Sequence, residues 1–227
     1  MKISLSIIFS FIVALSYAQQ PAPAPGAAPQ GPPPGPPTYS IRLSSTSFED
    51  GAVIPAKHLG GGPPPTPPTG GAAPTTPPTG GGAPTTPPTG GASPQFSWTG
   101  FPAATQTFVL YMHDLDVTRN KSIEDATHWV VWNIPATTTS LAENLPNAAT
   151  LPDGSQQYSM RGPVYAGPGA PAAGPYHHYI FELLAVDIKL DITPGANTAE
   201  TRDKIFEAVK GHVLAKGIYV GRAKRLQ

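Results

Sequence analysis

The sequence predicts a mainly β protein, an antiparallel β-sandwich with peripheral helices. Three long apolar runs have the length and the β-branched and aromatic content of buried strands, and they span Thr107–His113, His128–Ile134 and His177–Ile188. Each run ends in polar residues or in Pro and Gly. Shorter strand patterns come before and after them, at Tyr39–Leu43 and Gly217–Ala223. Several strands with one late helical pattern are typical of a β-sandwich that carries helices at its periphery.

The late helical pattern runs from Thr198 to His212. Thr198 or Thr201 is a candidate N-cap, because a hydroxyl at that position can accept a hydrogen bond from the first helical turn. Apolar residues recur on one face, at Ile205, Phe206, Val209 and Val213. We therefore expect a single helix that packs on the predicted sandwich.

The composition limits the classes of function. The 227 residues include 24 Gly and 31 Pro, too many for a chain that is globular throughout. The sequence has 14 basic residues (Lys and Arg) and 14 acidic residues (Asp and Glu), so there is no excess of positive charge to attract nucleic acid. The absence of cysteine from the sequence excludes a disulfide framework, a cysteine zinc site and a thiol nucleophile.

The N-terminus reads as a secretory signal peptide over residues 1–18. Lys2 precedes an apolar run from Ile3 to Leu15, and small residues lead to an expected cleavage after Ala18. The alternative is an N-terminal membrane anchor, but the run is shorter than the roughly 20 residues that a membrane-spanning helix needs. We expect a secreted, extracellular protein, with association to a cell wall left open, and no transmembrane segment after cleavage.

Two low-complexity segments flank and interrupt the expected domain, which covers residues 38–227. Residues 19–37 are almost entirely Pro, Ala, Gly and Gln and are expected to form a disordered tail. Residues 60–92 contain a ten-residue repeat of the type Ala-Pro-Thr-Thr-Pro-Pro-Thr-Gly-Gly-Gly. Its composition is compatible with a flexible insertion, a polyproline segment or an O-glycosylated stalk, of which we favour a glycosylated spacer.

Alternation along strands groups candidate polar residues by face. It places His177 and Tyr179 together, and it places His128 with Val130 and Trp132. Asp114 and Asp116 come at the expected end of the first strand. They fit either an Asx-type turn or a carboxylate that orients a histidine in a pocket.

Five motifs, in this order, resemble the phosphatidylethanolamine-binding protein family, and in particular its bacterial and archaeal Raf-kinase-inhibitor-like branch. The motifs are Ser93-Pro-Gln-Phe-Ser-Trp98, Asp114-Leu-Asp-Val117, His128-Trp-Val-Val-Trp-Asn-Ile-Pro135, Gly167-Pro-Gly-Ala-Pro171 and His177-His-Tyr-Ile-Phe181. The resemblance covers roughly Tyr39–Leu59 and Ser93–Arg225. It implies a β-sandwich whose small pocket accepts phosphate, a carboxylate or a phospholipid head group.

The resemblance also implies the pocket residues. Those that match the ligand-binding positions are Asp114, His128, His177 and Tyr179, and those that match the pocket rim are Asp116, Gly167, Pro168, Pro171 and His178. The chain departs from the family at Asp114-Leu-Asp-Val-Thr118, where two prolines are lost, and at His178, which replaces the usual Arg. If His178 contributes to the pocket, anion binding should weaken as the pH rises through neutrality.

Other functions have less support in the sequence than a binding protein. An enzyme built on Asp114 and His128 would need a nucleophile or a metal, and the sequence has no Gly-x-Ser-x-Gly or His-Glu-x-x-His motif. A metal on Asp114, His128 and His177 is conceivable, but we expect no catalytic residue, cofactor or resident metal. Alternatives are a protease-inhibitor-like module that acts on an unknown protein through the pocket rim, and a glycosylated structural protein. Asn120-Lys-Ser122 is an N-glycosylation sequon in an expected loop.

Overall fold

Two antiparallel sheets form the domain. In this computed structural model, which describes residues 40–60 and 91–225, the larger sheet has the strand order β6-β4-β3-β7-β8 and the smaller one the order β1-β2-β5. The larger sheet contains β3 (Thr107–Arg119), β4 (Glu124–Pro135), β6 (Gln156–Ser159), β7 (His177–Val186) and β8 (Val213–Ala223). The smaller contains β1 (Arg42–Ser44), β2 (Phe96–Thr99) and β5 (Ser140–Leu141). The predicted mainly β, antiparallel architecture is confirmed.

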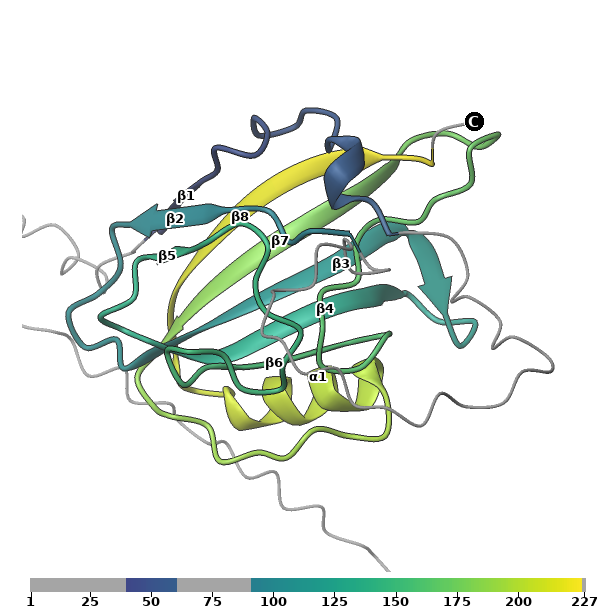
Figure 1. The fold of residues 1–227 in the computed structure, drawn as a ribbon. Coiled ribbons are helices and arrows are strands. Elements are labelled where there is room, and N and C mark those ends of the chain that lie inside the picture. The colour runs from purple at the N-terminus through teal and green to yellow at the C-terminus, as the bar shows by residue number, and fades with distance from the viewer. Residues whose placement is uncertain (1–39, 61–90, 226–227) are drawn as a thin grey trace, which may run out of the picture. The chain divides into compact units, whose positions relative to one another are not determined.

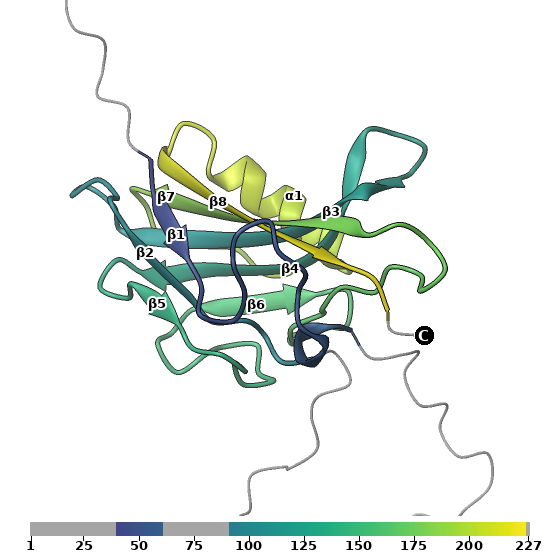
Figure 2. The same ribbon diagram turned by 90° about the horizontal axis from the view of Figure 1, so that it is seen from above.

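The larger sheet is covered on both faces. The smaller sheet lies on one face, and helix α1 (Thr198–Ala208) lies on the other (Figures 1 and 2). Between the sheets is an aromatic core that includes Phe96, Trp98, Phe108, Trp129 and Phe181. Under the helix is a second cluster that includes Val130, Trp132, Ile205 and Val209. Burial on both faces explains why the central strands read as continuous apolar runs.

A β-bulge in β4 changes the face to which His128 belongs. Met112 of β3 pairs with Trp129 and His113 pairs with Thr127, so His128 has no partner on β3. His128 and Trp129 therefore both face the inter-sheet side, where the His128 ring packs against Tyr179 at 5.2 Å. The prediction that His128 shares a face with Val130 and Trp132 is wrong, because alternation holds only along a regular strand.

The first long strand does not end at Asp114 and Asp116, as the sequence had suggested. β3 continues to Arg119, with an irregular register between Asp114 and Thr118, and forms a hairpin with β4 that projects from the sheet (Figure 2). Asn120 and Lys121 at its tip are exposed and have left-handed φ angles of 52° and 56°. The sequon at Asn120 thus lies in an accessible turn.

Helix α1 is shorter than predicted and begins at a different cap. Its N-cap is Asn197, whose side-chain oxygen accepts a hydrogen bond from the backbone N–H of Glu200 at 3.0 Å. Neither Thr198 nor Thr201 is the cap, because both side chains are already inside the helix and buried. The helix ends at Ala208, and Val213 belongs to β8.

The two sides of the predicted insertion are joined by hydrogen bonds next to the short 3-10 helix η1 (Ala56–His58). The N–H of Ala92 donates to the carbonyl of Lys57 at 2.9 Å, and Nδ1 of the buried His58 lies 2.7 Å from the carbonyl of Ala92. The described chain stops at Gly60 and resumes at Gly91, next to this clasp. The predicted signal peptide 1–18, the tail 19–37 and most of the insertion 60–92 lie outside the described residues.

Within residues 40–60 and 91–225, no helix has both the length and the apolar character needed to cross a membrane.

Candidate ligand-binding site

A cavity of about 280 Å³ opens where β7 begins, beside the base of the β3–β4 hairpin. The four predicted ligand-binding residues, Asp114 of β3, His128 of β4, and His177 and Tyr179 of β7, all line it. Gly167, Gly169 and Pro171 line it from the loop that precedes β7. The register Asp114–Tyr179 between β3 and β7 is what brings the carboxylate to the two β7 side chains.

Asp114 holds His177 in place. The Nδ1 of His177 lies 2.9 Å from Oδ2 of the buried Asp114, while Oδ1 of Asp114 accepts a hydrogen bond from the N–H of Asp116 at 3.0 Å. Both interpretations of this carboxylate therefore coexist, the local Asx-type bond and the contact with a pocket histidine. With Nδ1–H directed at Asp114, the Nε2 atom of His177 is left for a ligand.

His128 is neutral near pH 7. Its Nδ1 lies 3.3 Å from the carbonyl oxygen of Ala166, to which Nδ1–H can donate. Burial lowers the pKa of His128 below its ordinary value, and this outweighs the opposite effect of the negative charge on Asp114. The neutral ring lines the cavity and keeps one unprotonated nitrogen, which can accept a hydrogen bond.

Tyr179 keeps its phenolic proton. Its side chain is fully buried, and its hydroxyl oxygen accepts a hydrogen bond from the N–H of Gly169 at 3.3 Å. Burial, followed by the negative charge of Asp114, raises the pKa of Tyr179 well above its ordinary value. The hydroxyl is therefore a hydrogen-bond donor throughout the physiological pH range.

Of the five residues predicted at the rim, Gly167 and Pro171 line the cavity and Asp116, Pro168 and His178 do not. Alternation along β7 puts His178 on the opposite face from His177. There the backbone N–H and the Nδ1 of His178 lie 2.6 Å and 3.0 Å from Oδ2 of Asp116. The pKa of Asp116 is lowered, first by this backbone hydrogen bond and then by the His178 ring.

Three arginines at the cavity were not predicted. Arg119 ends β3, Arg161 follows β6, and Arg225 lies beyond the end of β8. They come from distant parts of the sequence and belong to no recognisable motif. Only the folding of the chain brings these three residues to one cavity, so the sequence holds no signal by which to find them.

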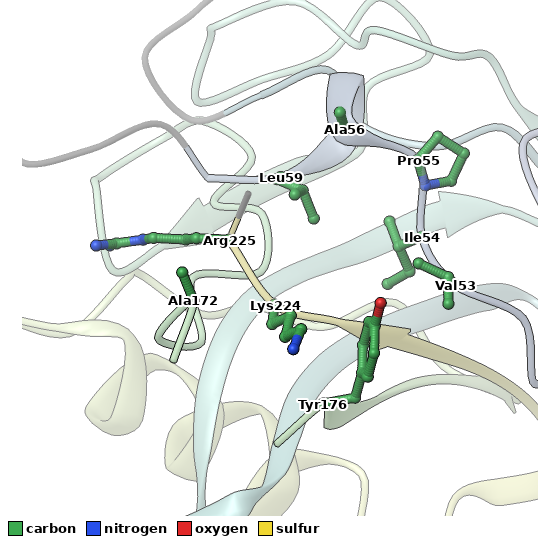
Figure 3. Close-up of a pocket in the computed structure, with 9 residues that line it drawn as sticks. All are labelled: Val53, Ile54, Pro55, Ala56, Leu59, Ala172, Tyr176, Lys224 and Arg225. Carbon is green, nitrogen blue, oxygen red and sulfur yellow. The ribbon is translucent and has the colours of Figure 1, made fainter. Parts of the chain in front are cut away.

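Arg225 also lines a neighbouring, more apolar cavity of about 490 Å³ (Figure 3). Its walls are formed by Val53, Ile54, Pro55, Ala56, Leu59, Ala172, Tyr176, Lys224 and Arg225. Lys224 Nζ lies 5.0 Å from the centre of the Tyr176 ring, a cation–π distance, while Arg225 points away from that ring. The two cavities thus meet at a cationic side chain.

The buried, neutral His128 should make folding sensitive to mild acid. Its pKa is lower in the folded state, so the unfolded chain binds more protons and the contribution of neutral His128 to stability is complete above about pH 6.5. It is lost as the pH falls from there toward the folded-state pKa. Asp114 and Arg119 are the charged groups that act on this ring.

Urea unfolding at about pH 7.5 and about pH 5.5 tests this prediction. Between these two pH values, His128→Gln should lose less unfolding free energy than the wild type. Equal losses would contradict the assignment.

Sequence comparison identifies relatives over most of the described domain. The sequence profile described as phosphatidylethanolamine-binding protein matches residues 44–224. The UPF0098 protein of Methanothermobacter thermautotrophicus is 39% identical over 131 residues, which cover 57% of this chain and 80% of that protein. The UPF0098 protein of Aquifex aeolicus is 34% identical over 130 residues, which cover 56% of this chain and 71% of that protein.

Solved structures share the fold. The crystal structure of YbcL from E. coli, described as a member of the mammalian PEBP family, has a TM-score of 0.60 and 20% identity, covering 82% of this chain and 99% of YbcL. A putative phosphatidylethanolamine-binding protein homolog from Chlamydia trachomatis has a TM-score of 0.58 and 23% identity, with the same coverage. The strand arrangement, the matched length and the identity to these relatives agree, and the chain belongs to the phosphatidylethanolamine-binding protein family.

Proposed function

We propose that this protein binds a small phosphate- or carboxylate-bearing ligand, such as the head group of a phospholipid, in the cavity between β3, β4 and β7. One observation carries the proposal: Arg119, Arg161 and Arg225 line the same cavity as the two histidines and Tyr179. Guanidinium groups suit planar carboxylates and phosphates because they donate several hydrogen bonds in a fixed geometry. The negative charge of Asp114 is partly offset by its bond to His177.

The dimensions of the cavity support a head group rather than an entire lipid. A volume of about 280 Å³ lies just below the range that is usual for small-molecule sites. Tyr179 supplies a hydroxyl donor, and Nε2 of His177 and of His128 supply further polar contacts. An anion next to His128 stabilises its protonated form, so binding should take up a proton and be stronger at lower pH.

Calorimetric titration tests the proposal. Phosphate, phosphoethanolamine and sulfate would be titrated at about pH 6 and about pH 8, sulfate being the control anion whose own charge is constant over this range. We expect saturable heat with higher affinity at the lower pH, and an affinity at least about tenfold weaker in His128→Ala and His177→Ala. His212→Ala is the matched control, because His212 has the same kind of contact with Asp187, at 2.8 Å, outside the cavity.

Two results would overturn the anion site. One is the absence of saturable heat from the wild type with all three anions. The other is an equal loss of affinity in His212→Ala and in the two cavity variants, since that would indicate a general effect of removing a histidine.

We also propose a binding rather than a catalytic role and a location outside the cell. The first is supported by the sequence, which has no cysteine and neither a Gly-x-Ser-x-Gly nor a His-Glu-x-x-His motif. The second is supported by the N-terminal sequence, with Lys2, the apolar run Ile3–Leu15 and Ala18 before the expected cleavage. N-terminal sequencing of the protein recovered from culture medium should begin at Gln19, and retention of Met1 on the purified protein would contradict this.

A further inference from the structure

We propose that the ligand carries an apolar group next to its anionic group, and that this apolar group occupies the neighbouring cavity of about 490 Å³. We call that space the apolar cavity, and the cavity between β3, β4 and β7 the anion cavity. The ligand class is then an amphiphilic anion, such as an alkyl monoester of phosphate. The inference rests on the proposed function, because it needs an anion in the anion cavity.

Aliphatic and aromatic side chains form most of the wall of the apolar cavity. Six of its nine lining residues are aliphatic, and Tyr176 adds an aromatic ring. Figure 3 shows the side chains of Ile54, Leu59 and Tyr176 turned toward the space between them. Val53 and Tyr176 are both exposed large apolar side chains, at 47% and 40%. A ligand that covers them removes apolar surface from water, which favours binding.

The two cavities adjoin along three segments of the chain. Leu59 and Ala172 line the apolar cavity, their neighbours Gly60 and Pro171 line the anion cavity, and Arg225 lines both. The backbone N–H groups of Gly60 and Arg225 donate to carbonyl oxygens of the loop that ends at Pro171, at 2.7 Å and 2.9 Å. These bonds hold the three segments together at the boundary. A ligand whose anionic group meets Arg225 therefore lies next to the apolar walls.

The cations around this boundary select the charge of the ligand. No carboxylate within residues 40–60 and 91–225 forms an ion pair with Arg119, Lys224 or Arg225. Lys224 Nζ lies 5.0 Å from the centre of the Tyr176 ring, a contact that supplies no carboxylate. Uncompensated cations beside apolar walls suit a ligand that is anionic at one end and apolar at the other, and they disfavour a cationic ligand.

Calorimetric titration of the full-length chain with phosphate, methyl phosphate and hexyl phosphate tests the inference. The two esters carry the same anionic group and differ in the length of the apolar group. Each methylene that leaves water should raise the affinity about fourfold. We expect hexyl phosphate to bind at least about tenfold more tightly than methyl phosphate. Titrations at several temperatures should also give hexyl phosphate the more negative heat-capacity change, which is the mark of buried apolar surface.

Two variants locate the alkyl chain. Tyr176→Ser and Val53→Ser each remove part of the apolar wall, and neither residue lines the anion cavity. Both side chains are exposed, so their replacement should leave the protein folded. We expect each variant to bind phosphate like the wild type and to lose at least about threefold of the preference for hexyl over methyl phosphate.

Val213→Ser is the matched control for Val53→Ser. Val213 begins β8, is 44% exposed and lines neither cavity. The same chemical change at this position should keep the full preference for hexyl phosphate.

The outcomes separate this inference from the proposed function. Saturable phosphate binding with equal affinities for methyl and hexyl phosphate would overturn the inference alone, and would leave the apolar cavity to a side chain of a protein partner. A preference that is unchanged in both Tyr176→Ser and Val53→Ser would overturn it too, since the alkyl chain would then bind elsewhere. The absence of saturable heat with all three ligands would overturn the proposed function and the inference together.

Discussion

Replacing Gly167 by alanine should weaken anion binding at least about tenfold and lower the free energy of unfolding by roughly 1–3 kcal/mol. A Cβ atom at position 167 would lie 2.1 Å from the carbonyl oxygen of His58 and 2.7 Å from the nitrogen of Gly60. Both are backbone atoms, so no side-chain rotation can relieve the overlap. The loop has to move away from His58, and Gly167 itself lines the cavity.

Gly169→Ala is the matched control for this prediction. Gly169 lines the same cavity from the same loop, but a Cβ there would meet only Arg225 Nη2, at 3.6 Å, which is an ordinary contact. We expect a change in stability within about 0.5 kcal/mol and nearly unchanged affinity. Urea unfolding and calorimetric titration of both variants would measure the difference. Similar losses in the two variants would mean that the close backbone approach at Gly167 does not shape the site.

Phe181→Ala should cost about 3–5 kcal/mol of stability, the largest effect we expect from a single substitution. The Phe181 side chain is fully buried between the two sheets, with its ring centre 4.8 Å from that of Phe96 and 6.1 Å from that of Phe48. Removing it opens a cavity at the point where the segment before β2, β2 itself and β7 meet. A loss of this size is a large part of the total stability of an ordinary domain.

Ile123→Ala provides the comparison for Phe181. Ile123 is 98% exposed beside the tip of the β3–β4 hairpin, so its truncation should change the unfolding free energy by less than about 0.5 kcal/mol. Urea unfolding followed by tryptophan fluorescence measures both. A loss below about 1 kcal/mol for Phe181→Ala would show that the two sheets repack around the gap or do not form a common core.

The sequence predicted the layers of this fold better than the details of its strands. The runs that became β3, β4 and β7 are apolar on both faces because the small sheet and α1 cover them from opposite sides. The bulge at His128 could not be predicted, because the segment His128–Ile134 contains no glycine or other residue that would indicate a bulge. The helix was recognised from its apolar period, but its cap was misassigned, because the cap is Asn197, which lies one residue before Thr198 and four before Thr201.

Prediction of the site depended on motifs. Asp114, His128, His177 and Tyr179 were identified because they occur in recognisable sequence contexts, and they line one cavity. The position of His178 away from that cavity follows from strand alternation, which the motif alone does not express. Arg225 lies in no motif and reaches the cavity only because the chain continues past β8 along the loop that contains Ala170.

The clasp between Lys57, His58 and Ala92 makes the position of residues 61–90 a suitable point for protein engineering. Because the chain leaves and returns at bonded neighbours, a second folded protein whose own termini are close together can be placed there without pulling the sheets apart. Gly60, the last residue before that position, lines the cavity for which we propose anion binding. A fluorescent protein inserted here would lie next to that proposed site, which makes the domain a starting scaffold for a biosensor.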